Sequence, residues 1–166
     1  RGIDSGMNAR NLMLVRFDPA LSRYDEKQTE RLLADILRDA ESLAGVRSAS
    51  VTNLLPLSMG GNYTQVGVEA ERSAVMAVGP RYFETMGIPL LAGAEFRPAP
   101  SHEPVAIVNQ ELAHRLYPNQ NALGRMVLEG GGRARIIGVA ANSKYQTMQE
   151  SEATPILYRP ILDTYA

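Results

Sequence analysis

In the first third of the chain, the spacing of hydrophobic residues changes from that of a strand to that of a helix and then back to that of a strand. An almost unbroken apolar run over residues 12–17 (LMLVRF) predicts a mostly buried strand. Apolar residues then recur every three to four positions as far as residue 43, which predicts an amphipathic helix. Residues 46–55 alternate apolar and small polar side chains, which is typical of a strand. Strand, helix and strand together predict a βαβ unit with a right-handed crossover.

The predicted helix has recognisable ends and two distinct faces. Asp25 and Gln28 have the spacing of a capping box, and Gly45 is a suitable residue to end the helix. Charged residues of both signs alternate on the opposite face, which indicates a face exposed to water rather than a functional cluster. The apolar stripe consists of Leu32, Leu33, Ile36, Leu37, Ala40 and Leu43.

Residues 74–96 carry the clearest sequence of start and stop signals in the chain. Strands are predicted over 63–69 and 73–78, joined by a polar turn at 69–72. Pro80 is expected at the first position of a short helix, and Gly87 at its left-handed end. The helix would place three apolar side chains on one face. We therefore predict a buried structural corner formed by Tyr82, Phe83 and Met86.

The sequence pattern of the second half of the chain predicts mostly strands. A proline-rich segment at 97–104 predicts a linker and a candidate hinge, and a strand follows at 105–108. Asn109 is expected to cap a short helix. The three glycines at 130–132 separate two strand-like runs and predict a hairpin, because a phosphate-binding loop would need a lysine and a following helix. A last short strand is predicted at 156–158.

Composition narrows the range of functions. The chain has 166 residues, 45% hydrophobic content and a net charge of −1, so it can form a core but has no basic surface for nucleic acid or anionic lipid. It has no cysteine, which excludes disulfides, thiolate catalysis and cysteine-ligated zinc. No apolar run reaches about 18 residues, and a start at Arg1 suggests a piece excised from a longer protein.

No motif for catalysis or for a cofactor is present. His102 lies in a proline-rich segment and His114 in a predicted short helix, and His102 with Glu103 is the only adjacent pair of possible ligands, which does not give the ligand spacing of a metal site. Glu84, Glu95 and Glu129 are the acidic residues in apolar surroundings, but predicted turns separate them. We therefore predict no enzyme, no metal and no cofactor, with a hydrolase as the least favoured alternative.

Several short motifs in collinear order resemble the periplasmic core domain of MacB-like ABC transporter permeases, the group that also carries an FtsX-like membrane domain. The match runs from residue 6 to residue 139 and covers most of the chain. Its segments are GMNARNLML at 6–14, RY at 23–24, LAGVRSASV at 43–51, LPL at 55–57, VGPRYFETMGIPLLAG at 78–93, PVAIVN at 104–109, AHRLYP at 113–118, LGR at 123–125 and IIGV at 136–139.

The resemblance implies an α+β fold in which a porter-like βαβ unit packs with a mostly β lobe called the sabre. Residues 1–93 would form the porter-like lobe, and residues 94–166 the sabre-like lobe with its one short helix. A second porter unit, which the family has after the sabre, is missing from this sequence. The family's serine before the proline is replaced by Gly79, so that a helix cap is lost, and the segment after Gly93 also departs from the family pattern.

The resemblance also implies a function. The chain would be a non-enzymatic, extracytoplasmic domain of an inner-membrane permease, attached to the transmembrane part of its own chain and paired with a second subunit. It would couple motion of the membrane helices to a periplasmic adaptor or to an exported substrate. The alternative is a module that binds a substrate, peptide or lipoprotein directly. The alternative would use a loop and the neighbouring strand ends, whereas polar contacts at the tips of the lobes would favour docking of an adaptor. The candidate partner-contact loop consists of Leu57, Ser58, Met59, Gly60, Gly61 and Asn62.

Overall fold

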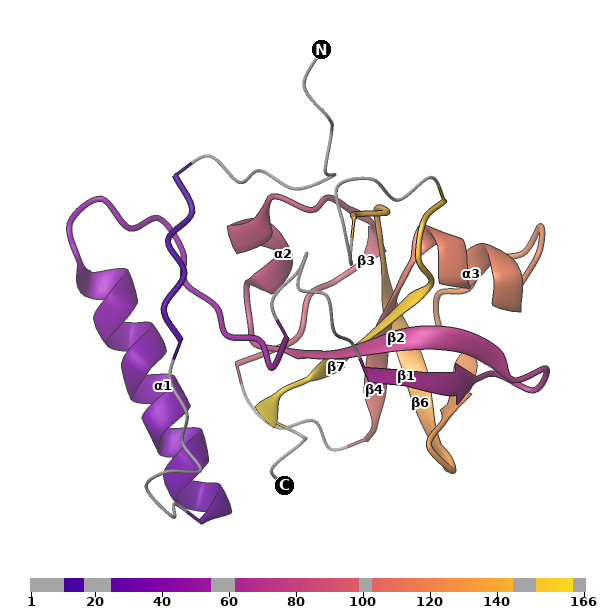
Figure 1. Ribbon diagram of the computed structural model, residues 1–166, viewed down its shortest axis with the longest axis horizontal. Helices are drawn as coiled ribbons and strands as arrows, with labels where there is room; N and C mark the ends of the chain where they lie inside the picture. The colour runs from indigo at the N-terminus through magenta and orange to yellow at the C-terminus, as the bar shows by residue number, and fades with distance from the viewer. Residues whose placement is uncertain (1–10, 17–24, 55–61, 99–102, 145–151, 163–166) are drawn as a thin grey trace.

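The computed structural model describes residues 11–16, 25–54, 62–98, 103–144 and 152–162. It is a mixed α/β fold, in agreement with the predicted α+β class, with a body of strands and few helices (Figure 1). The helices are α1 (Glu26–Ser42), α2 (Tyr82–Met86) and α3 (Gln110–Leu116). The strands are β1 (Asn62–Val66), β2 (Glu71–Val78), β3 (Leu90–Gly93), β4 (Val105–Asn109), β5 (Met126–Glu129), β6 (Gly132–Ala140) and β7 (Ile156–Pro160).

The described strands form one sheet that closes on itself. Their order is β3-β6-β4-β7-β2-β1-β5, and β5 also pairs with β6. Six strands therefore make a small barrel, and β3 extends from β6 outside the ring. Most neighbours are antiparallel, but β2 with β7 and β4 with β6 are parallel.

Successive side chains on a strand point to opposite faces, and here both faces are buried. One cluster, which we call the barrel core, takes residues from all six strands of the ring, so it lies inside the barrel. Leu112 of α3 belongs to it, which places α3 over one end of the barrel. The barrel core consists of Val66, Val75, Ala106, Val108, Leu112, Ala122, Val127, Ile136 and Leu157.

The second cluster, the outer core, lies on the other face of β2, β4 and β7, where α2 covers the strands. Because side chains on both faces of these strands are buried, their sequences are nearly continuous apolar runs. The outer core consists of Ala74, Met76, Val78, Tyr82, Phe83, Met86, Ile88, Phe96, Ile107, Ala140, Ile156 and Tyr158.

The sheet crosses the predicted boundary at residue 93. Strands β2 and β3 precede it, yet β2 pairs with β7 and β3 pairs with β6. Rotation of one half against the other about residues 97–104 would break these hydrogen bonds, so the hinge hypothesis for this linker is wrong. The division into a porter-like lobe (1–93) and a sabre-like lobe (94–166) stays a prediction.

The first predicted βαβ unit does not form a strand pair in the described part of the chain. Residues 12–16 and 46–50 are not in strands, and residues 51–54 make a single bridge, between Thr52 and Val78. The helix itself is confirmed, including the capping box of Asp25 and Gln28, although it ends at Ser42 with Leu43 as its C-cap. The periodicity identified the helix correctly. Of the two flanking segments, only residues 51–53 have a partner in the described sheet, and that partner is β2 rather than residues 12–16.

Most of the remaining elements agree with the sequence predictions. The hairpin of β5 and β6 and the Asn109 cap of α3 are confirmed. The turn between β1 and β2 is displaced, because β2 already begins at Glu71. No helix in the described residues combines the length and the apolar character needed to cross a membrane.

Candidate functional site

The predicted contact loop lies mainly outside the described residues. Of its six members, Leu57, Ser58, Met59, Gly60 and Gly61 fall there, so the structure does not test them. Asn62 is exposed and begins β1, where it pairs with Val75 of β2. The structure therefore describes this site only through the residues that flank it, up to residue 54 and from residue 62, which we call the base of the loop.

Both ends of this loop lie along the same edge of β2. Before it, the backbone N–H of Gly79 donates to the carbonyl of Val51 (2.7 Å), and that of Asn53 donates to the carbonyl of Ala77 (3.1 Å). After it, residues 62–66 continue antiparallel to residues 75–71. The described residues on either side of the loop, 51–53 and 62–66, thus both run antiparallel to β2 along one edge.

Two polar side chains hold the incoming end of the loop. The Oδ1 atom of Asn53 accepts from the backbone N–H of Ala77 (2.9 Å), so this side chain takes the place of a strand partner. Thr52 Oγ1 donates to the carbonyl of Leu54 (2.9 Å) and closes a local turn. Leu54 packs against the outer core. The base of the loop is therefore anchored to the body by backbone, polar and apolar contacts.

The corner at α2 is buried, as predicted. Tyr82, Phe83 and Met86 are 2%, 1% and 8% exposed. The ring of Phe83 meets those of Tyr82 and Tyr158 edge-on, with centroids 5.4 and 4.9 Å apart. Edge-to-face pairs of this kind add to the stabilisation from burial. The hydrophobic corner is structural and leaves no aromatic surface for a ligand.

The beginning of α2 differs from the prediction. Pro80 is not a helical residue: the helix begins at Tyr82, and Arg81 is its N-cap with a left-handed φ of 58°. The end of the helix is as predicted, because Gly87 adopts φ 65° there. Arg81 makes no side-chain cap of its own, so the first N–H groups of the helix need an acceptor from elsewhere.

Glu95 supplies that acceptor. Its carboxylate accepts from the backbone N–H of Phe83 (2.8 Å). Burial raises the pKa of Glu95, and this effect outweighs the opposing hydrogen bonds from the N–H groups of Phe83 and Glu84. The cap that the sequence lost at Gly79 is therefore replaced by a residue after β3. A side chain at Gly79 would meet Val51 Cγ1 at 2.8 Å, which explains the glycine at that position.

Arg81 links α2 to the C-terminal end of α1. Its Nη1 donates to Glu41 Oε1 (2.6 Å), its Nε to Glu84 Oε2 (2.9 Å) and its Nη2 to the carbonyl of Arg47 (3.0 Å). The hydrogen bond from Arg81 lowers the pKa of Glu84. We call Arg81, Glu41, Glu84 and the carbonyl of Arg47 the Arg81 joint. Sequence reasoning missed it, since nothing in the pattern indicates that an arginine between Pro80 and Tyr82 adopts a positive φ.

The acidic residues considered for catalysis have other partners. Glu84 pairs with Arg81, and Glu95 caps α2 close to it. Glu129 lies on β5 and pairs with Arg159 of β7 (3.1 Å). His114 is exposed on α3, and His102 lies outside the described residues. Within the described ranges no three acidic or histidine residues come together as metal ligands would.

Comparison with known proteins identifies the family. The family model described as "MacB-like periplasmic core domain" matches residues 2–166. The chain belongs to this family. The resemblance found in the sequence motifs is thereby confirmed, and the domain is of the periplasmic type found in transporter permeases.

A curated relative agrees with this assignment. Macrolide export ATP-binding/permease protein MacB 1 of Aeromonas hydrophila is 28% identical over 144 residues, which are 84% of this chain and 22% of that protein. The chain thus spans about a fifth of the length of that relative.

Two solved structures share the fold. The periplasmic region of MacB from Actinobacillus actinomycetemcomitans superimposes with a TM-score of 0.55 at 18% identity, over 79% of this chain and 56% of the other. The extracellular domain of the noncanonic ABC-type transporter YknZ from Gram-positive bacteria gives 0.53 at 15% identity, over 76% and 61%. At these identities the likeness concerns the fold alone.

Proposed function

We propose that this chain is the extracytoplasmic domain of an ABC transporter permease and that it couples motion of the membrane helices to events outside the membrane. The match of the MacB-like periplasmic core domain over residues 2–166 carries this proposal. The A. hydrophila relative is named as a macrolide export protein with ATP-binding and permease parts, which supports a role in export. The domain takes no catalytic part, and ATP is hydrolysed by a separate nucleotide-binding domain.

The architecture suits a part that transmits force. A barrel that is packed inside and covered outside deforms little, because a close-packed core resists changes of volume. Gly130 and Gly131 connect the hairpin strands β5 and β6, and Gly132 already begins β6, so a strand follows and not the helix of a nucleotide-binding loop. We therefore assign the body a mechanical role and no chemical one.

The proposed coupling role requires three partners. They are the transmembrane part of the same full-length chain, a second permease subunit in a dimer, and a periplasmic adaptor protein. We propose that the adaptor contacts the loop Leu57, Ser58, Met59, Gly60, Gly61 and Asn62. The support for this site is its base, which is fixed to β2 on both sides.

Site-directed photocrosslinking in cells that produce the full-length permease and its adaptor tests the assignment. A photoreactive residue at Asn62 should crosslink to the adaptor, and one at Gln110, exposed on α3, serves as the matched control. Crosslinking from Gln110 but not from Asn62 would remove the loop from the interface. In a full-length permease without other cysteines and in cells that lack the adaptor, Asn62→Cys would also allow labelling with a membrane-impermeant maleimide. Protection of that cysteine in intact cells would then contradict the extracytoplasmic location.

The alternative function is a module that captures a substrate, peptide or lipoprotein directly. The apolar character of Leu57 and Met59 in the loop is the observation that favours it. Titration of the 166-residue chain with a fluorescent lipopeptide distinguishes the two functions. Saturable binding that is lost in Met59→Ser would favour direct capture, and its absence together with the Asn62 crosslink would favour coupling.

A further inference from the structure

Part of the outer face of the barrel lies outside the outer core. That core takes residues from β2, β4, β7 and the end of β6, but none from β5. Because Val127 of β5 belongs to the barrel core, its neighbours Met126 and Leu128 point outward. They are 50% and 37% exposed. The hairpin of β5 and β6 therefore presents two apolar side chains at the surface.

Two arginines of β6 lie beside these apolar side chains. In the antiparallel register of the hairpin, Met126 is opposite Arg135, and Leu128 is opposite Arg133. Side chains directly opposite each other on one face of such a pair are neighbours. Arg135 is paired with Glu103, whereas the exposed Arg133 has no carboxylate partner in the part of the chain that the structure describes. Arg133 therefore adds an uncompensated positive charge next to Leu128.

A second guanidinium is held in place at the other end of β5. The side chain of Arg125 lies over the ring of Tyr117, 5.1 Å from its centroid. Its Nε donates to the carbonyl of Asn121 (2.9 Å), and its Nη2 donates to Oε1 of Gln120 (2.7 Å). These three partners are neutral, so they fix the direction of the guanidinium without cancelling its charge. An arginine that is ordered in this way is preorganised to bind a carboxylate from another molecule.

The turn after β1 extends the same surface. The backbone N–H of Gly67 donates to the carbonyl of Leu128 (2.8 Å), which places the next residue, Val68, beside the hairpin. Val68 is 89% exposed. Glu69 follows it and is exposed, but its single negative charge is outnumbered by the two arginines without a carboxylate partner. We call this surface the hairpin face, and it consists of Val68, Arg125, Met126, Leu128 and Arg133.

We propose that the hairpin face binds a segment of the periplasmic adaptor in which apolar side chains lie between carboxylates. The apolar side chains of such a segment pack on Met126 and Leu128, and its carboxylates pair with the guanidiniums of Arg125 and Arg133 at the two ends. Strand β1 joins the hairpin face to the base of the loop at Asn62, so one partner can contact both surfaces. The identity of the partner rests on the proposed function, whereas the chemistry of the segment follows from the face itself.

Binding of the purified adaptor to the full-length permease in nanodiscs tests the role of the charges. The double variant Arg125→Gln/Arg133→Gln should raise the dissociation constant by about tenfold, because two charge pairs are lost. Arg31→Gln/Arg38→Gln removes the same charge from two exposed positions of α1 and is the matched control. Arg133→Gln alone has no described side-chain contact to lose and should weaken binding by about threefold, which keeps the test informative if the double variant does not fold. Equal losses in the two double variants, or none in folded Arg133→Gln, would overturn the proposal.

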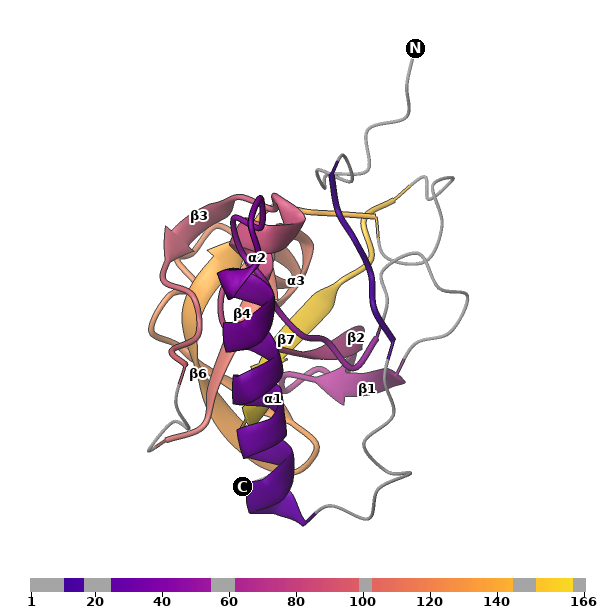
Figure 2. The same ribbon diagram turned by 90° about the vertical axis from the view of Figure 1, so that its left-hand side faces the viewer.

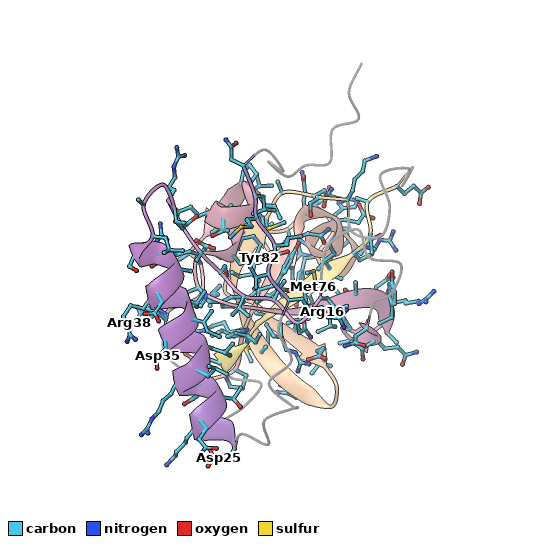
Figure 3. The ribbon with its side chains drawn as sticks, turned by 60° about the vertical axis from the view of Figure 1, so that its left-hand side comes forward. Arg16, Asp25, Asp35, Arg38, Met76 and Tyr82 are labelled. Carbon is cyan, nitrogen blue, oxygen red and sulfur yellow. The ribbon has the colours of Figure 1, made fainter. Side chains whose placement is uncertain are left out.

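Photocrosslinking in cells that produce the full-length permease and its adaptor tests the location. A photoreactive residue at Met126 should crosslink to the adaptor, and one at Arg38 is the control. In Figure 1, α1 lies at the left of the body and β1, β2 and β6 lie to the right, and in Figure 2 α1 stands in front of the strands. The labelled Arg38 is on the side of α1 that faces away from the body (Figure 3). Crosslinks from Met126 only to lipid or to the permease itself, or equal adaptor crosslinks from both positions, would overturn the proposal.

The probes at Met126 and Asn62 distinguish this inference from the proposed function. If Asn62 crosslinks to the adaptor and Met126 does not, the hairpin face is refuted and the contact loop stands. If Met126 crosslinks and Asn62 does not, the contact loop is refuted and the hairpin face stands.

Discussion

The barrel and α1 bury their apolar residues to very different extents. Strand β2 buries every residue from Ser73 to Val78 and contributes to both cores, whereas α1 buries Leu33 and Thr29. Apolar contacts are not directional but are lost together when a close-packed unit opens, while an exposed guanidinium can exchange its carboxylate for water. One sequence thus contains a close-packed body and a helix whose described residues are mostly exposed or half-buried. The predictions below probe this contrast from the largest expected effect to the smallest.

Phe83→Ala should cause the largest loss in the outer core. The ring is 1% exposed and packs against two tyrosines, so we expect the free energy of unfolding to fall by about 3–5 kcal/mol. Urea denaturation measures it. Leu91→Ala, on the edge strand β3 and 53% exposed, is the control and should change stability by less than about 0.5 kcal/mol. A loss below about 1 kcal/mol for Phe83→Ala would mean that the corner is a contact surface.

Asn109→Ala should rank second. The buried side chain accepts from the N–H groups of Leu112 (3.0 Å) and Ile156 (2.9 Å) and donates to the carbonyl of Thr154 (2.8 Å). Removing it takes the acceptor from two buried N–H groups and the donor from the half-buried carbonyl of Thr154, so we expect a loss of about 2–4 kcal/mol.

Asn121→Ala is the comparison for Asn109→Ala. Its exposed side chain accepts from the N–H of Leu123 (3.0 Å), a group that water can satisfy instead. Thermal unfolding of both variants should show a much smaller loss for Asn121→Ala. Equal losses would show that the polar link between α3 and β7 does not stabilise the barrel.

Glu95→Ala should cost about 1 kcal/mol, because it removes the acceptor that caps α2. Glu95→Gln keeps an oxygen at the same place and should cost less. If both variants lose the same amount in chemical denaturation, the cap is not the reason for the glutamate.

The raised pKa of Glu95 predicts that the stability of the domain depends on pH. Burial raises the pKa of Glu95 above the ordinary value of a glutamate, so the native state binds the proton more tightly than the unfolded chain does. Its contribution to stability therefore falls as the pH rises from about 4.5 through the native pKa. Denaturation at a series of pH values should show that this fall is absent in Glu95→Gln. An unchanged pH profile would contradict the raised pKa.

Arg38→Ala should have the smallest effect. Its pair with Asp35 is exposed and lies within α1 (2.8 Å), so we expect less than about 0.5 kcal/mol. Unfolding followed by circular dichroism measures this, and Lys27→Ala on the same helix is the control. A loss above about 1 kcal/mol would mean that the outer face of α1 is part of the folded body after all.

The sequence by itself determined the elements whose signals are local. The capping box of Asp25 and Gln28, the Asn109 cap, the hairpin at 130–132 and the left-handed Gly87 each depend on neighbours a few residues apart. The family also followed from motifs in order along the chain. Local geometry and the collinear order of motifs are both written in one dimension, so they can be read there.

Only the tertiary structure decided which segments meet. Closure of β5 onto β1 and β6, and the parallel pairing of β2 with β7, joined the two halves in one sheet and excluded the hinge at 97–104. Glu95 replaced the missing cap and Arg81 reached Glu41 across forty positions of sequence. Such contacts depend on how the cores close, since an apolar run or a charged side chain has the same appearance in the sequence whichever partner it meets.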